Sequence, residues 1–286
     1  GLGNIWKFPY MTAESGGGAF VLIYIVSVIF LALPIMCAEI LIGKRGKQNP
    51  VNSLRTLSSE ASYYYKRESD PLLNRTTTAK KQFENTDIFS NWELVGWMGI
   101  LAGIFILSFY SVIAGWTLSY IIKSTTSTFY LISAADASAT FNSLISNPKE
   151  LILWHTVFMI LTCYIVSKGI KSGIENAIKF LIPGLFLILI LLAIYTFSLS
   201  GFSQAMSYFF IADFDKVNSD VVLSAMGMAF FSLSIGMGSL MIYGSYLPDD
   251  TSIFQVSAAV AFFDTLVAVL AGIIIFPIVF TYNLDP

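Results

Sequence analysis

Several oxygen-bearing side chains of this chain lie within long apolar runs, where polar groups are uncommon. Asn4 follows two glycines near the start of the chain, and Ser232 and Ser234 lie in a run interrupted by glycine. Asp264 has apolar neighbours on both sides, and an unpaired carboxylate in that setting would either protonate or acquire a cation. Amide, hydroxyl and carboxylate oxygens are hard donors that suit Na⁺ better than a soft metal. We therefore expect Na⁺ to be the counter-charge of Asp264, and the other three side chains to be suitable donors for that ion.

Glycines interrupt two of the apolar runs, at Gly1-Leu2-Gly3-Asn4 and from Ser232 to Gly238. Glycine weakens a helix locally, and unwound backbone at membrane depth survives only where it lines a buried site. Freed carbonyls can bind a cation, and the N-termini of half-helices can face an anionic group. Close helix packing through small residues is the alternative. Because both clusters adjoin oxygen donors, we favour two broken helices.

A second acidic residue, Glu39, also lies within an apolar run, five residues before Lys44. Acidic residues inside a membrane span are functional hypotheses by default, because a charge at that depth is costly. Glu39 lies near one end of its run, so we favour a structural role in which its carboxylate accepts hydrogen bonds from backbone N–H groups.

The composition is that of a membrane protein. Hydrophobic residues make up 56% of the 286 residues and charged residues only 12%, whereas a soluble domain carries roughly 25% charged residues. The mean hydropathy is +0.72. The formal charge is −2, and the absence of a basic face argues against a nucleic-acid partner. No catalytic triad or metal-ligand cluster is evident, so we expect neither an enzyme nor an organic cofactor.

The apolar runs predict several membrane-spanning helices. About 20 apolar residues are needed to cross a bilayer as a helix, and continuous helix is the default because lipid offers no partner to backbone polar groups. Seven segments are predicted, the first of them incomplete: 1–12, 19–42, 94–122, 151–167, 177–199, 221–246 and 253–281.

Lysine and arginine set the expected orientation. Nine of the 16 lie between Lys44 and Lys81, and three more lie between 168 and 179. The positive-inside rule therefore places the loops 44–92 and 168–176 in the cytoplasm. Segments 13–18, 124–150 and 200–219 then lie outside, and 247–252 lies inside. Part of the tract from Ser58 to Glu84 is polar enough to predict disorder, and the sequon at Asn74 is discounted because it falls on the cytoplasmic side.

The first residues resemble the signature of the neurotransmitter:sodium symporter family, prokaryotic type. The stretch from Gly1 to Tyr10, GLGNIWKFPY, looks like the family's first-helix motif, and Glu14 to Phe20, ESGGGAF, looks like the start of its second helix. The similarity then continues through the chain at Pro34, Glu39, Tyr110, Gly115 to Thr117, Lys168 to Ile170, Gly173 to Glu175, Ser232 to Gly238, Asp264, Thr265 and Gly272 to Pro277.

The resemblance implies an all-α polytopic membrane protein with a partial leucine-transporter-like inverted-repeat fold, helices 1b to 7. It implies one transmembrane transporter domain over 1–286 that is truncated at both ends. The first repeat would span 1–199 and the start of the second 220–286. The residues give no indication of oligomeric state.

The resemblance also implies roles for individual residues. Asn4, Ser232 and Asp264 match the family's first sodium site, and the second sodium site would lie mostly outside this chain. Tyr110 matches the tyrosine that meets the substrate carboxylate, together with backbone N–H groups near Leu2 and Gly3. The positions that match the side-chain pocket are Ile106, Phe231, Ser234, Ile235 and Met237. Lys7, Glu39 and Tyr246 match gating or structural positions.

Four departures from the family pattern bear on substrate and ions. Lys7 replaces an outer-gate arginine and loses the bidentate fork, while Met237 replaces an aromatic pocket residue with an adaptable one. Ala268 carries neither the serine of chloride-dependent members nor the glutamate of some chloride-independent ones, so chloride independence is expected. Gly1 stands where amine transporters have an aspartate, which favours an amino acid over a monoamine.

The predicted function is sodium-coupled import of an amino acid, hydrophobic or aromatic, across the plasma or inner membrane by alternating access. Na⁺ is the coupling ion, and the amino acid and the lipid bilayer are the expected partners. A transport-inactive sensor or structural homologue is the alternative, and a membrane enzyme is less favoured because paired acid–base groups are lacking.

Overall fold

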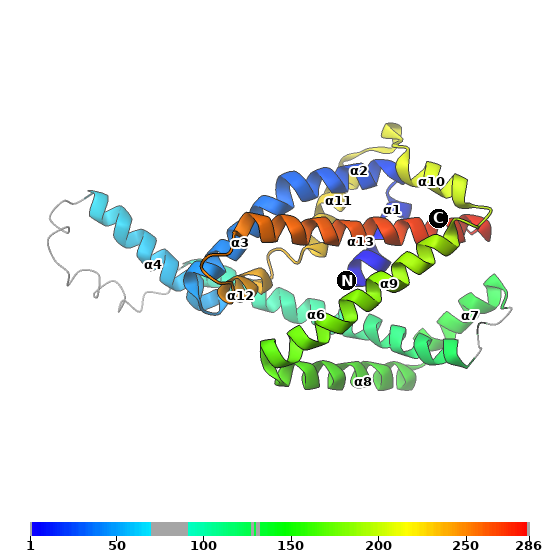
Figure 1. The fold of residues 1–286 in the computed structure, drawn as a ribbon, viewed down its shortest axis with the longest axis horizontal. Coiled ribbons are helices and arrows are strands. Elements are labelled where there is room, and N and C mark those ends of the chain that lie inside the picture. Colours follow the sequence, from blue (N-terminus) through cyan, green and yellow to red (C-terminus); the bar gives the residue numbers. More distant parts are fainter. Residues whose placement is uncertain (1, 70–90, 127–128, 130–131, 285–286) are drawn as a thin grey trace. The chain divides into compact units, whose positions relative to one another are not determined.

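The computed structural model describes residues 2–69, 91–126, 129 and 132–284 (Figure 1). This part of the chain is almost entirely helical, and its one β contact is an isolated bridge between Gly17 and Ala212. Five helical stretches in it are long and apolar enough to cross a membrane: Gly18–Gly46, Asn91–Thr125, Pro148–Ser167, Ser172–Thr196 and Ile253–Thr281. The predicted polytopic helical membrane protein is therefore confirmed.

The helices follow one another with short connections. Their order is a π-helical turn η1 (Gly3–Lys7), α1 (Phe8–Glu14), α2 (Gly18–Ser27), a π-helical turn η2 (Val28–Ala32), α3 (Leu33–Gly46), α4 (Pro50–Ser69), α6 (Asn91–Thr125), α7 (Ala134–Ile145), α8 (Pro148–Ser167), a π-helical turn η4 (Ile170–Glu175), α9 (Asn176–Thr196), α10 (Phe202–Phe210), a 3₁₀ turn η5 (Phe214–Lys216), α11 (Ser219–Ser232), α12 (Ser239–Ser245) and α13 (Ile253–Thr281).

The chain forms two compact units. The first comprises residues 3–103 and 208–269, and the second comprises Leu2, 104–207 and the residues from 270 onward. Helices α6 and α13 each begin in the first unit and end in the second. These units do not coincide with the predicted repeats 1–199 and 220–286, whose symmetry stays a prediction.

The predicted span 221–246 is interrupted at 233–238, between α11 and α12. Gly236 and Gly238 have φ angles of +84° and +71°, and Ser234 has a φ of +57°. Residues with a side chain rarely adopt this left-handed backbone region, whereas glycine adopts it without a steric penalty. The sequence therefore predicted this broken helix correctly, and its glycines explain why the chain can turn there.

The first glycine cluster behaves differently. Residues 3–7 form a π-helical turn that leads directly into α1, so the described part of this cluster is a widened helix, and the prediction of unwound backbone there is wrong. Gly1 lies outside the described residues. A π turn keeps most backbone groups paired while it displaces one carbonyl from the regular ladder, and such turns are frequent at functional sites.

Helices α3 and α12 pack backbone against backbone. A Cβ atom at Gly43 would overlap the carbonyl of Met241, and one at Gly244 would overlap the carbonyl of Ile40. Small residues that allow this approach are the usual means of helix association in a bilayer. Helix α12, the second half of the broken helix, is thus fixed to α3.

Two lysines extend this contact beyond the ends of the helices. Lys44 donates to the carbonyl oxygens of Asp249 and Thr251 at 3.0 and 2.7 Å, and Lys47 donates to that of Leu247 at 2.9 Å. Lys47 also pairs with the Asp249 carboxylate at 3.1 Å, and this hydrogen bond and charge lower the pKa of Asp249. The loop between α12 and α13 is therefore held against the end of α3.

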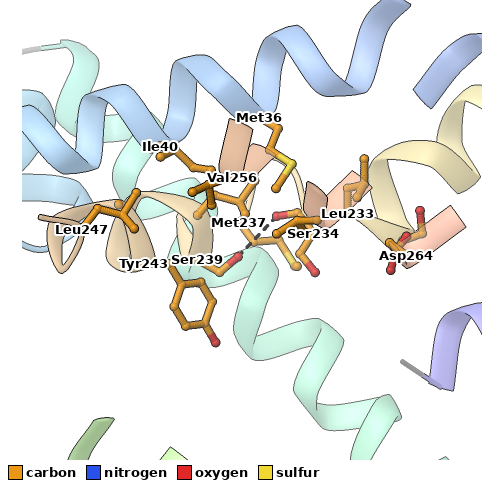
Figure 2. Close-up of a pocket in the computed structure, with 14 residues that line it drawn as sticks. Met36, Ile40, Leu233, Ser234, Met237, Ser239, Tyr243, Leu247, Val256 and Asp264 are labelled. Atoms are coloured by element: carbon orange, nitrogen blue, oxygen red, sulfur yellow. Dashed lines mark hydrogen bonds between the residues drawn. The ribbon is translucent and has the colours of Figure 1, made fainter. Parts of the chain in front are cut away.

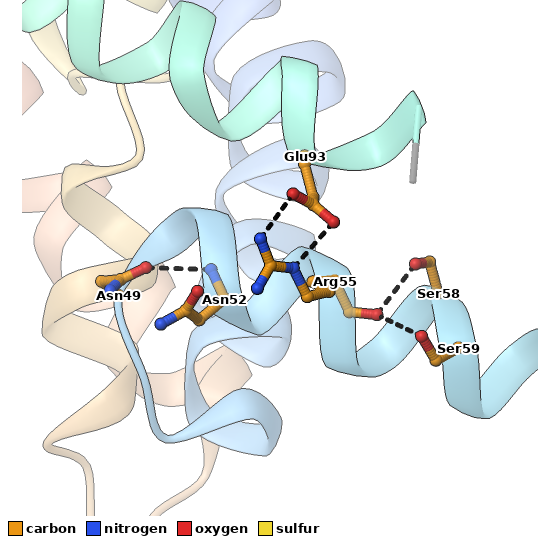
Figure 3. Close-up of polar contacts among 6 residues, drawn as sticks. All are labelled: Asn49, Asn52, Arg55, Ser58, Ser59 and Glu93. Carbon is orange, nitrogen blue, oxygen red and sulfur yellow. Dashed lines mark hydrogen bonds and ion pairs between the residues drawn. The ribbon is translucent and has the colours of Figure 1, made fainter. Parts of the chain in front are cut away.

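Helix α4 covers the first part of the tract from Ser58 to Glu84, which was expected to be partly disordered. Residues 58–69 belong to α4, and the rest of the tract and Asn74 lie outside the described residues, so the expected disorder stays a prediction. Asn49 accepts a hydrogen bond from the Asn52 N–H at 2.9 Å and caps the helix. Arg55 pairs through two nitrogens with Glu93 of α6, both at 2.8 Å (Figure 3). The Glu93 side chain is 1% exposed. Its bidentate pair with Arg55 therefore stabilises α4 against α6, an interaction that the polar composition of α4 alone did not predict.

The second unit is built by helices that also meet closely. A Cβ atom at Gly115 of α6 would lie 3.0 Å from the backbone nitrogen of His155 in α8, and Lys123 pairs with Glu150 at 3.2 Å. Between α9 and α13, the Thr196 hydroxyl donates to the Ile273 carbonyl at 3.4 Å. Predicted spans 151–167 and 177–199 correspond to α8 and α9.

The α3–α12 contact makes Gly43 sensitive to one added methyl group. Gly43→Ala should lower the free energy of unfolding by about 1–3 kcal/mol, because a new Cβ overpacks a rigid backbone contact. Gly227→Ala is the matched control, since a Cβ there meets nothing within 4 Å. Thermal unfolding of the two purified variants in detergent measures the difference, and equal stability would show that the contact is not tight.

Candidate functional site

The first unit brings Asn4 and Asp264 together from opposite ends of the sequence. The Asn4 Nδ2 donates to Asp264 Oδ1 at 2.7 Å and to the Asp264 carbonyl oxygen at 2.8 Å. Asn4 is only 1% exposed. The π-helical turn η1 holds the asparagine, and α13 carries the aspartate near the middle of its length. This pair is the centre of the candidate ion site.

Ser232 adds a hydroxyl at the point where α11 ends. Its Oγ lies 3.2 Å from the hydroxyl of Tyr24 in α2, and Ser232 and Asp264 line the same cavity. Tyr24 is fully buried. The sequence analysis did not single out Tyr24, although a tyrosine within an apolar span signals that its hydroxyl has a polar partner.

The donor set fits an alkali cation. Asp264 Oδ2 is buried and has no hydrogen-bond partner in the described part of the chain. A buried acceptor of this kind calls for a cation or a bound water. The site combines one carboxylate with neutral amide and hydroxyl oxygens, and the described residues contain no group of three His, Cys, Asp or Glu that could hold a metal. Asn4, Ser232 and Asp264 stay the candidate residues for a Na⁺ site.

The candidate substrate residues divide between the two units. In the first unit, a Cβ atom at Gly3 would lie 2.9 Å from Cε1 of Phe231, so the ring contacts the backbone there. Ser234, Ile235 and Met237 lie in the break between α11 and α12. The break also approaches α6, because a Cβ at Gly99 would lie 3.1 Å from the carbonyl carbon of Met237.

In the second unit, the Leu2 N–H donates to the Tyr110 hydroxyl at 2.9 Å. The two groups expected to share a substrate carboxylate are therefore adjacent. Ile106 lies one turn before Tyr110 on α6. A pocket that joins these residues to Phe231 stays a prediction, because they belong to different units.

The three predicted gating or structural residues all lie in the first unit. Lys7 ends η1, and its Nζ lies 5.5 Å from the centroid of the Tyr10 ring, a cation–π contact. Tyr246 follows α12 directly and is 61% exposed. Glu39 is buried, and its Oε1 accepts a hydrogen bond from the Gly236 N–H at 2.7 Å. A backbone acceptor is the role that the sequence favoured for Glu39.

Comparisons with known proteins identify the family of this chain. A model of the sodium:neurotransmitter symporter family matches residues 1–62 and 125–283. The chain belongs to this family. It is 35% identical over its whole length to the uncharacterized sodium-dependent transporter YhdH of Bacillus subtilis, and 32% identical to an uncharacterized sodium-dependent transporter of Haemophilus influenzae.

A solved structure supports the fold. The crystal structure of MhsT in complex with L-phenylalanine is similar to the whole chain, with 38% identity and a TM-score of 0.84. The chain covers 57% and 58% of the two sequence relatives and 58% of the MhsT chain, so it spans a little over half their length. The predicted partial leucine-transporter-like fold is confirmed.

The Glu39–Gly236 bond offers a test of how the break is held. Glu39→Leu should increase amide hydrogen exchange at 233–238 by about tenfold or more, because losing a buried partner costs about 1–3 kcal/mol. Glu39→Gln should leave exchange close to wild type, since its amide oxygen can still accept the Gly236 N–H. Exchange measured by mass spectrometry distinguishes the two variants, with exposed Glu14→Leu as the control. Unchanged exchange in Glu39→Leu would show that other contacts hold the break.

Proposed function

We propose that the protein is a sodium-coupled symporter of an amino acid. The observation that carries this proposal is the Asp264 carboxylate, which accepts from Asn4 and has one buried oxygen without a hydrogen-bond partner among the described residues. Family membership and sodium-dependent relatives support the same ion. Since these relatives are longer than this chain, the activity is that of the complete transporter in its membrane.

Alternating access gives the residues their roles. Asn4, Ser232 and Asp264 bind the ion, and the break at 233–238 lets α11 and α12 change their relative angle. The first unit contains α1, α2, α3, α11, α12 and the first part of α13, together with α4 and the first part of α6, which supports its movement as one body. Ion and amino acid stabilise the same closed state, so each raises the affinity for the other. The loops 44–92 and 168–176 are proposed to face the cytoplasm of the plasma or inner membrane.

The proposed substrate is a hydrophobic or aromatic amino acid. The adjacent Leu2 N–H and Tyr110 hydroxyl suit a carboxylate, and Phe231, Ile235 and Met237 offer apolar surface. MhsT, which is similar over the whole chain, was crystallised with L-phenylalanine. Gly1 stands where amine transporters have an aspartate, which also favours an amino acid. Gly1 itself lies outside the described residues. A substrate carboxylate beside Asn4 would share the ion with the protein.

Chloride independence is proposed for the same site. Ala268 lies one turn after Asp264 on α13 and is fully buried. Its methyl group offers no donor to an anion, while Asp264 already supplies a negative charge.

Asp264→Ala in the full-length protein should abolish Na⁺-dependent amino-acid uptake into proteoliposomes, because it removes the only charge of the ion site. Asp250→Ala is the control, since that aspartate is exposed in the loop before α13 and should retain transport. Uptake by Asp264→Ala with unchanged Na⁺ dependence would refute this site.

Substrate binding provides a separate measurement. A scintillation proximity assay on the full-length protein should detect Na⁺-dependent binding of at least one of leucine, tyrosine, tryptophan or phenylalanine. Replacing Na⁺ with K⁺ should remove the signal, because the larger ion does not fit a site of short oxygen contacts. If none of these amino acids binds in Na⁺, the proposed substrate class is wrong, and the alternative of a transport-inactive homologue gains support.

A further inference from the structure

The first turn of α4 lies between α6 and the break at 233–238. A Cβ atom at Gly96 of α6 would lie 2.8 Å from Cα of Val51, and a Cβ atom at Gly238 would lie 2.9 Å from Cγ of Pro50. The two residues that begin α4 therefore contact both α6 and the end of the break. All of these residues belong to the first unit.

Gly238 determines where α12 begins. It directly precedes that helix, and its φ angle is +71°. The Ser239 hydroxyl donates to the Ser234 carbonyl oxygen at 3.3 Å across the break (Figure 2), which is longer than the usual O–H···O hydrogen bond. Pro50 has a rigid ring and no backbone N–H, so it packs against Gly238 without competing for the acceptors of the break. Helix α4 therefore supports the break through a rigid apolar contact.

The Arg55–Glu93 pair holds this contact in register. Arg55 lies one turn after Val51 on α4, and Glu93 lies one turn before Gly96 on α6. The two nitrogen–oxygen distances of the pair are both 2.8 Å (Figure 3). A bidentate guanidinium–carboxylate pair restrains orientation as well as distance. Any shift of α4 along α6 would therefore have to break at least one of these hydrogen bonds.

Burial makes this pair different from the other ion pair of α4. The Glu93 carboxylate is buried, while 53% of the Arg55 side chain is exposed, and a buried charge that loses its partner is strongly destabilising. The Arg45–Glu60 pair, which joins α3 to α4 at 3.0 Å, has side chains that are 59% and 34% exposed. Pairs that water can reach contribute little, so Arg55 and Glu93 are the charges that fix the position of α4.

We propose that Arg55 and Glu93 are positioning residues for transport. Their ion pair seats Pro50 against Gly238, and this contact holds the break, with Ser232 before it, in the geometry that binds the ion and the amino acid. The two side chains act through the first turn of α4 rather than by touching either ligand. This role rests on the proposed function, whereas the effect of the pair on the break requires no transport.

Arg55→Lys in the full-length protein tests how the break is positioned. Lysine keeps the charge that Glu93 needs, so the protein should fold, but it cannot form two parallel hydrogen bonds. Amide hydrogen exchange at 233–238, measured by mass spectrometry, should rise about threefold or more, because exchange reports local opening and the pair that opposes it is weakened. Arg45→Lys is the matched control, since it makes the same substitution in the exposed pair, and it should exchange as the wild type does.

The Na⁺ requirement of amino-acid binding separates positioning from stability alone. In a scintillation proximity assay, Arg55→Lys should need about three times more Na⁺ for half-maximal binding, because apparent affinity falls with the population of the binding-competent state. Maximal binding per folded protein should be unchanged. Arg45→Lys should match the wild type in both quantities.

Equal exchange at 233–238 in Arg55→Lys and the wild type would overturn the proposal, as would an equal rise in Arg45→Lys. A rise in exchange with an unchanged Na⁺ requirement would also overturn it, because the pair would then hold the break without serving the ion site. If the wild type itself binds no amino acid, the proposed function fails and the role in transport fails with it. The exchange measurement still decides in that case whether the pair holds the break.

Discussion

The break between α11 and α12 depends on having partners for backbone groups that a continuous helix would have paired internally. An unpaired N–H at membrane depth costs several kcal/mol, so residues 233–238 survive only because other elements approach them. Glu39 accepts the Gly236 N–H from one side, and Gly99 of α6 allows close contact from another. The Gly43 and Gly244 contacts then prevent α12 from moving away from α3. The position of Ser232 in the proposed sodium site follows from these contacts, because Ser232 is the last residue before the break.

Sequence reasoning predicted the spans and the second break because both depend on strong local signals. Apolar runs predicted α8, α9 and α13. Glycines predicted the turn at 236–238, where Gly236 and Gly238 have positive φ angles in the structure. The proximity of Asn4 to Asp264 could not follow from local pattern, since 260 residues separate them. Resemblance to a family supplied it, and the hydrogen bond between their side chains agrees with that assignment.

The features that sequence missed depend on contacts between elements. The order of α4 comes partly from the Arg55–Glu93 pair, whose members lie 38 positions apart, so a polar composition suggested disorder instead. Tyr24 looked like one more aromatic residue of an apolar span, and only its distance to Ser232 shows a polar role. The π-helical turn at 3–7 was predicted to be unwound backbone. Glycine weakens an α-helix, but it does not determine whether the chain there unwinds or forms a π-helical turn.

A single carboxylate surrounded by neutral oxygens has a consequence for coupling. Asp264 accepts from Asn4 through Oδ1, and its Oδ2 has no hydrogen-bond partner among the described residues and is proposed to bind the cation. Had a second acid been present, the site would keep a net negative charge with the ion bound, and it would repel the carboxylate of a zwitterion. With one fixed charge, the ion and the carboxylate sum to zero, and the ion still attracts the dipole and carboxylate of a zwitterion through its unfilled coordination. In the proposed site each species therefore raises the affinity for the other, because the carboxylate of the zwitterion would bind the ion directly.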